Sequence, residues 1–108
     1  MKRTEMIKKQ DYFNFIIKNG KFVKDKNFVI YSVDNENSSC THFGIAIKNS
    51  IGNAVVRNKL KRQTRAIIDN NRKLFQFSKD YIIMIRNECL YSSFEDMNNS
   101  LVQLMKGN

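Results

Sequence analysis

The sequence lacks several features that mark common structural classes. It contains no proline, no Gly/Ser-rich linker, no internal repeat and no low-complexity segment, so we expect one continuous domain over residues 1–108. No apolar run approaches the roughly 20 residues that a membrane-spanning helix requires, which excludes a transmembrane protein. The N-terminal residues are charged rather than apolar, so no secretory signal is expected. These absences predict a small cytoplasmic domain.

Residues that usually carry catalysis or bind metal are scarce. Cys40 and Cys89 have no ligand-like spacing, and we expect two reduced, partly buried thiols, with a disulfide as the less favoured alternative. His42 is the only histidine; a structural role or an RNA contact is favoured there over a general base. One histidine and two separated cysteines cannot complete a zinc site. We therefore expect no catalytic residue and no metal ligand in the chain itself.

Acidic residues are few, and they are absent from one long segment. The chain has 19 Lys+Arg against 10 Asp+Glu, a formal net charge of +9. No acid occurs between Thr41 and Ile68, whereas five cations lie between Arg57 and Arg65. A second basic region covers the first 26 residues. A dense basic segment without acids favours a nucleic-acid-binding face over a merely solvated helix surface.

The first half of the chain predicts a helix and two strands. Apolar residues recur at helical spacing over residues 8–19, and Gly20 is expected to end that helix in the left-handed conformation. Residues 27–33 and 41–47 are rich in β-branched and aromatic residues and predict strands. The polar segment 34–39 between them fits a hairpin connection.

The second half predicts helix, strand and helix. A basic helix is expected over residues 53–70, with a short strand possible before it near Ile51. Residues 80–86 predict a buried strand, too continuously apolar to lie at an edge. Ser92 and Glu95 have the spacing of a capping box that opens a final amphipathic helix. The element order indicates an α+β fold in which helices cover a small sheet.

The basic helix separates apolar and cationic residues. At about 100° per residue, Val56, Leu60 and Ile67 share one side, with Thr64 beside them. The opposite side carries Arg57, Asn58, Lys61, Arg62 and Arg65. Arginine forks and lysine ammonium groups on successive turns can follow a phosphate backbone. From spacing alone the prediction is a nucleic-acid-binding helix.

The same segment resembles a known signature. The string GNAVVRNKLKR followed by Gln63, Thr64 and Arg65 is similar to that of the bacterial ribonuclease P protein component, and the resemblance extends over nearly the whole chain. It implies a two-layer α/β sandwich: a small mixed sheet with a left-handed βαβ crossover, resembling the second domain of ribosomal protein S5. A left-handed crossover would be an exception to the general right-handed rule.

The resemblance also implies a function. The chain would be the accessory protein subunit of ribonuclease P, the endoribonuclease that removes the 5′ leader of precursor tRNA to give the mature 5′ end. The RNA subunit would hold the active site and the Mg²⁺ ions. The implied partners are ribonuclease P RNA and precursor tRNA, with no membrane and no obligate protein partner. The implied RNA-subunit-binding residues are Arg57, Asn58, Lys59, Lys61, Arg62 and Arg65.

The family also grips the single-stranded leader between its first helix and its sheet. The implied leader-binding residues are Phe13, Ile17, Tyr31, Lys48 and Arg86. Aromatic rings at positions 13 and 31 would stack on unpaired bases, although both could instead be core residues. The chain departs from the family at Lys59, where an arginine is usual, and at Ile17, where an aromatic residue is usual. Near Lys48 the family often has a second lysine.

Two other functions fit the residues less well. A structural RNA-binding protein, such as a ribosomal component, could use the same basic helix without any part in cleavage. A protein-only nuclease would need a catalytic cluster, which the sequence does not contain. Copurification with ribosomal RNA rather than ribonuclease P RNA would favour the first alternative. Cleavage of RNA by the chain alone would favour the second.

Overall fold

The computed structural model describes residues 5–35, 40–76 and 78–107. Along the chain the helices and strands are α1 (Gln10–Asn19), β1 (Lys21–Lys24), β2 (Phe28–Asp34), β3 (His42–Ile47), α2 (Ala54–Asn70), β4 (Lys79–Ile85) and α3 (Phe94–Lys106). Two short 3-10 helices, η2 (Arg72–Leu74) and η3 (Asn87–Tyr91), flank β4 in sequence. The expected α+β fold is confirmed.

The four strands form one mixed sheet in the order β1-β2-β4-β3. β1, β2 and β4 pair antiparallel, whereas β3 runs parallel to β4. Because β3 and β4 are parallel neighbours joined through α2, they make the expected βαβ unit. Its left hand stays a prediction, since strand order and register do not fix the hand of a crossover. The buried run Tyr81–Ile83 confirms β4 as an interior strand.

The hairpin expected between residues 34 and 39 is wrong. β2 and β3 are not neighbours, because β4 inserts between them and pairs with both. A strand that is apolar on both faces gains most from an interior position, where both faces are covered. β2 therefore ends, and β3 begins, on opposite sides of the first residues of β4. Residues 36–39, between these two strands in sequence, lie outside the described residues.

Two further expectations about strands need correction. β1 was not expected, because a four-residue strand of sequence KFVK with lysine at both ends gives little signal. It forms a hairpin with β2, in which Phe22 lies opposite Tyr31. Conversely, no strand forms at Ile51. Residues 49–52 make turns, and Ile51 is buried in the core.

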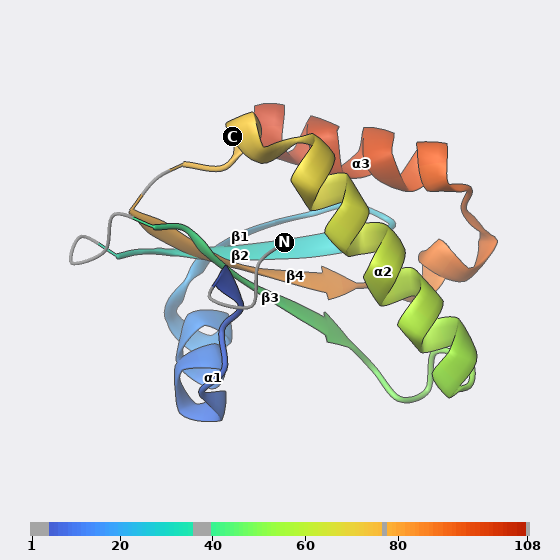
Figure 1. Ribbon diagram of the computed structural model, residues 1–108, viewed down its shortest axis with the longest axis horizontal. Coiled ribbons are helices and arrows are strands. Elements are labelled where there is room, and N and C mark those ends of the chain that lie inside the picture. Colours follow the sequence, from blue (N-terminus) through green and yellow to red (C-terminus); the bar gives the residue numbers. More distant parts are fainter. Residues whose placement is uncertain (1–4, 36–39, 77, 108) are drawn as a thin grey trace.

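Helices cover both faces of the sheet to different extents (Figure 1). α2 and α3 lie on one face, where Leu60, Ile67, Met97 and Leu101 join the sheet residues of the main core. α1 lies on the opposite face, against β2 and β4, and buries Ile16. The sandwich of helices and sheet is as expected, and α1 adds partial cover to the second face.

Two helix ends differ in detail from expectation. Gly20 has φ −74° and ψ 157°, so it is extended rather than left-handed. A glycine is required there for another reason: a Cβ would lie 2.6 Å from the carbonyl oxygen of Ile16 and 2.8 Å from that of Ser32. The capping box of α3 is formed by Ser93 and Asp96, one residue later than expected. Glu95 is therefore not part of the cap.

The N-terminal segment covers the outer edge of β3. The Ile7 amide donates to the Phe43 carbonyl oxygen at 2.8 Å, and Glu5 forms an ion pair with Arg72. The Arg72 guanidinium carbon lies 5.3 Å from the centroid of the Phe43 ring. These contacts protect an edge strand that would otherwise expose unpaired backbone groups.

Candidate nucleic-acid interface

The basic helix α2 is fixed by a cap and a buried stripe. The Asn53 side chain accepts a hydrogen bond from the Val56 amide at 3.0 Å, which closes the helix N-terminus. Leu60, Thr64, Ile67 and Ile68 are buried, as their helical spacing predicts. The buried Thr64 hydroxyl donates to the Leu60 carbonyl oxygen at 2.8 Å. α2 therefore turns its remaining side toward solvent in one fixed orientation.

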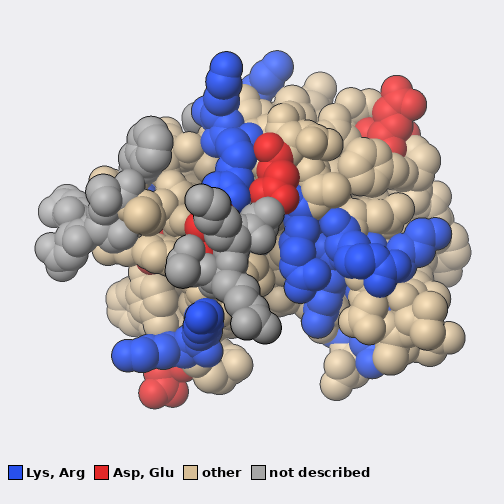
Figure 2. Space-filling view, in the orientation of Figure 1, with Lys and Arg blue, Asp and Glu red and all other residues tan. Residues whose placement is uncertain are grey.

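The solvent side of α2 carries the cations that the sequence predicted. Asn58, Lys59 and Arg62 are exposed, and Lys61 and Arg65 are half-buried. None of these five side chains has a hydrogen bond or ion pair within the described part of the chain. Figure 2 shows Lys and Arg side chains gathered over α2. We call these five residues the α2 face; its polar groups are available to an external anion.

Arg57 behaves differently from the other predicted residues of α2. Its Nη1 atom donates to the carbonyl oxygens of Asn49, at 3.0 Å, and Gly52, at 2.8 Å. Gly52 has φ +63°, a conformation that favours glycine, and a Cβ there would lie 2.9 Å from the Val56 side chain. Arg57 thus ties the turn before α2 to the helix. The turn contains Lys48, another predicted RNA contact, at its start.

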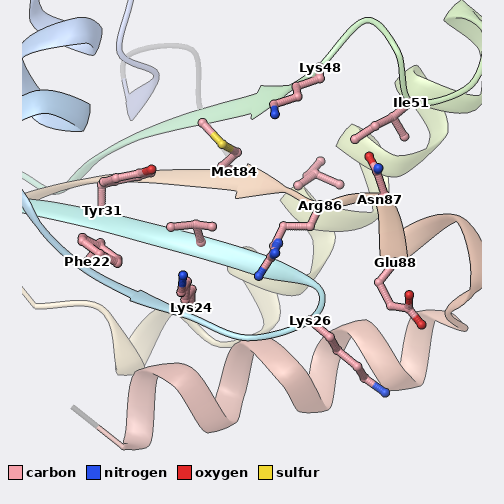
Figure 3. Close-up of a pocket in the computed structure, with 12 residues that line it drawn as sticks. Phe22, Lys24, Lys26, Tyr31, Lys48, Ile51, Met84, Arg86, Asn87 and Glu88 are labelled. Carbon is pink, nitrogen blue, oxygen red and sulfur yellow. The ribbon is translucent and has the colours of Figure 1, made fainter.

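A pocket opens on the same face of the sheet as α1. We call this cavity of about 650 Å³ the sheet pocket (Figure 3). Its wall includes three predicted leader-binding residues, Tyr31, Lys48 and Arg86. It also includes residues that were not among the predicted leader contacts, although Lys24 and Lys26 belong to the N-terminal basic region. These are Phe22, Lys24, Lys26, Val29, Ile51, Met84, Ile85, Asn87 and Glu88.

The two predicted leader-binding residues of α1 do not line the sheet pocket. Phe13 packs its ring onto Gly44, where a Cβ would lie 2.7 Å from the Phe13 Cε2 atom. Glycine at position 44 therefore lets α1 approach the sheet closely. Ile17 is half-buried on the same helix. Phe13 and Ile17 lie on α1, which contacts β2 and β4, whereas Tyr31, Lys48 and Arg86 line the sheet pocket.

Arg86 is partly committed to holding the pocket wall. Its Nη1 atom donates to the Asp25 carbonyl oxygen at 2.6 Å, and its amide donates to the Asn27 carbonyl oxygen at 2.9 Å. Asp25 in turn accepts from the amides of Asn27 and Phe28 at 2.8 and 2.9 Å. Arg86 thus fixes the turn between β1 and β2, which carries Lys26. This role depends on contacts between segments far apart in the sequence, so no sequence pattern indicates it.

His42 has the structural partner that the sequence favoured. Its Nδ1 atom lies 2.9 Å from Asp80 Oδ1, and Asp80 is fully buried. Asp80 also accepts from the Tyr12 hydroxyl and, at 2.9 Å, from the side-chain Nδ2 atom of Asn35. Burial, followed by the hydrogen bond to Asp80, raises the pKa of Tyr12, so its hydroxyl stays a donor at neutral pH. The cluster joins α1, the start of β3 and β4.

The cysteines form no disulfide, as expected, but the expectation that both are partly buried is wrong for Cys40. Cys40 is exposed and Cys89 is buried, and burial raises the pKa of the Cys89 thiol. In the described ranges no three His, Cys, Asp or Glu side chains come together as a metal site would require. No described helix is long and apolar enough to cross a membrane.

Comparison with known proteins decides the family. The model of the family "Ribonuclease P" matches residues 1–107. The chain belongs to the ribonuclease P protein family. The ribonuclease P protein component of Bacillus cereus strain AH187 is 34% identical over 106 residues, covering 98% of this chain and 92% of the relative. Family membership makes the chain the accessory subunit of an endoribonuclease that processes the 5′ leader of tRNA.

Solved ribonuclease P proteins share the fold. A Staphylococcus aureus RNase P protein mutant with defective mRNA degradation activity is 31% identical, with a TM-score of 0.88 over 96% of this chain and 87% of that chain. The RNase P protein from Thermotoga maritima is 28% identical, with a TM-score of 0.84 over 96% of this chain and 97% of that chain. The resemblance stated from the signature is thereby confirmed for family and fold.

Proposed function

We propose that this ribonuclease P protein binds the ribonuclease P RNA through the α2 face. The observation that carries the proposal is a row of cations without internal partners on the helix that bears the family signature. Cations without internal partners lose no intramolecular bond when they contact phosphate, so no such loss offsets the binding free energy of each contact. Contacts to several phosphates make the affinity fall steeply with salt concentration.

We place the leader of precursor tRNA on the opposite side of the sheet. Tyr31, Lys48 and Arg86 come from β2, from the turn after β3 and from the end of β4, and they converge on one open pocket. An aromatic ring beside cations suits an unpaired strand, since bases stack and phosphates pair with charge. Phe13 and Ile17 on α1 would border this strand farther along the same face of the sheet.

The protein then acts by binding and positioning. Cations on two faces reduce the repulsion between two RNAs that must lie close together. Contacts to the leader make precursor tRNA bind more tightly than the leaderless product. The described residues offer no group of three acidic, histidine or cysteine side chains for an ion. We therefore assign Mg²⁺ mainly to the RNA subunit, with the exposed Asn58 amide able to approach an ion shared with phosphates. We place this processing in the cytoplasm.

Reconstitution tests the proposal. Cleavage of precursor tRNA by a ribonuclease P RNA at low Mg²⁺ should rise strongly when the protein is added. The protein alone should cleave neither precursor tRNA nor mRNA. The holoenzyme should also bind precursor tRNA more tightly than leaderless tRNA. No gain in cleavage, or equal affinity for the two tRNAs, would contradict the assigned role.

A further inference from the structure

Phe22 is an exposed aromatic side chain that neither the helix signature nor the strand pattern indicated. It lies at the centre of β1, the open edge of the sheet, and 58% of it is exposed. Its cross-strand partner is Tyr31. The two ring centroids lie 5.9 Å apart at an interplanar angle of 45°. An aromatic pair held by strand register is rigid and needs little ordering before it binds.

The pair lies in a cationic setting. Phe22 and Tyr31 line the sheet pocket together with Lys24, Lys26 and Lys48. The side chains of these three lysines have no hydrogen bond or ion pair to any residue that the structure describes. The single acid of the pocket wall is Glu88, which Figure 3 places away from Phe22 and Tyr31. The pocket therefore offers an apolar platform and free positive charge at the same place.

We propose that Phe22 and Tyr31 form a stacking platform for one base of an unpaired RNA strand, with Lys24, Lys26 and Lys48 holding the adjoining phosphates. The proposal deepens the proposed function, on which it rests, by assigning the leader a specific base site. It also accounts for Ile17. The chain has no ring at that position of α1, and Phe13 packs on Gly44. Phe22 supplies a second ring beside Tyr31 on the sheet.

Stacking and simple strand packing make different demands on residue 22. A packing role needs an apolar side chain of similar size, which leucine supplies. A base platform needs a flat ring, which leucine lacks. Alanine substitution of a stacking aromatic commonly weakens binding by about tenfold per base. Phe22→Leu should therefore keep the fold but lose as much affinity for single-stranded RNA as Phe22→Ala loses.

Because the chain contains no tryptophan, an introduced tryptophan is the only indole that emits. Phe22→Trp places a single indole on the platform, whose emission should be quenched when a base stacks on it. The probe is a single-stranded oligoribonucleotide of about eight nucleotides, titrated into the full chain. Phe22→Trp should bind at least as tightly as the parent, and Phe22→Leu about tenfold more weakly. Circular dichroism verifies that each variant folds.

Phe15→Leu is the matched control. Phe15 is 51% exposed and stacks near Tyr12 on α1, outside the residues that line the sheet pocket. Its replacement should leave oligonucleotide affinity unchanged. Unchanged affinity in Phe22→Leu, or unquenched emission at saturation in Phe22→Trp, overturns the platform.

A parallel measurement in the holoenzyme separates this proposal from the proposed function. The parent should favour leader-bearing over leaderless tRNA, and Phe22→Leu should lose most of that preference. If the parent shows no preference while the oligonucleotide still quenches Phe22→Trp, the proposed function fails and the platform stands. If the parent shows the preference and Phe22→Leu keeps all of it, the platform fails alone.

Discussion

The α2 face and the sheet pocket are both basic, but they are built in opposite ways. The α2 face comes from one helix, and its five polar side chains are free of internal partners within the described residues. The sheet pocket collects residues from three strands, two turns and η3, and its Arg86 is bonded to a neighbouring turn. The α2 face was therefore predicted almost whole from the sequence, whereas only three residues of the sheet pocket, Tyr31, Lys48 and Arg86, were among the predicted contacts.

The arginines show why the difference matters. Arg62 is exposed without an internal partner, whereas Arg57, five residues earlier, holds the carbonyl oxygens of Asn49 and Gly52. Both lie on α2 among basic neighbours in sequence, Arg57 in the first turn and Arg62 near the middle. A guanidinium with five donors serves equally well to bind phosphate or to cap backbone carbonyls. Only the position of the turn decides which task each arginine performs.

The largest expected effect concerns the support of the pocket side of the sheet. Asp80→Ala removes the buried acceptor of Tyr12, His42 and Asn35. Leaving several donors unpaired should lower the free energy of unfolding by about 3 kcal/mol, measured by urea denaturation. Tyr12→Phe, which removes one donor, should cost about 1 kcal/mol. A smaller loss for Asp80→Ala than for Tyr12→Phe would contradict the role of Asp80 as the centre of the cluster.

The second prediction tests whether the two surfaces are independent. Arg62→Ala combined with Arg65→Ala should weaken binding of the ribonuclease P RNA about 100-fold, since each charged contact contributes about 1.5 kcal/mol. The salt dependence of log K should become shallower by about two. Affinity for a single-stranded leader oligonucleotide should not change. A parallel loss of oligonucleotide binding would show that the two surfaces act as one.

The third prediction separates the two arginines of α2. Arg57→Gln should increase hydrogen exchange at the Ile51 amide about tenfold, because its two bonds to the turn are lost. Arg62→Gln removes the same charge without touching the turn, so exchange there should stay at the parent rate. Binding of the ribonuclease P RNA should weaken more in Arg62→Gln. Equal hydrogen exchange at the Ile51 amide in the two variants would contradict the different roles assigned to Arg57 and Arg62.

The smallest effect concerns the thiol beneath the β1–β2 turn. Cys89 Sγ donates to the Asn27 carbonyl oxygen at 3.2 Å, and burial raises its pKa. At neutral pH the Cys89 side chain should therefore hold little thiolate. An alkylating reagent should modify Cys40 in the native protein and reach Cys89 only on unfolding, as mass spectrometry can measure. Rapid native labelling of Cys89 would mean that the turn opens readily.

Sequence patterns were most reliable where one element carried its own signal. α2 was expected over residues 53–70 and spans Ala54–Asn70 with Asn53 as its cap. The apolar run of β4 placed it inside the sheet. The pattern failed for β1 and for the supposed hairpin between β2 and β3, because strand pairing depends on partners far apart in sequence. Phe22 was missed with β1, whereas Lys24 and Lys26 were noticed only as members of the N-terminal basic region.

The sequence by itself determined the family, the basic helix and which side of that helix is buried, because helical periodicity and a contiguous signature are local properties. Tertiary structure decided the rest. It inserted β4 between β2 and β3, brought Phe22 beside Tyr31, and committed Arg57 and Arg86 to backbone carbonyls. The physical reason is that a side chain's charge and shape are encoded at its position, whereas its partners are set by how distant segments pack.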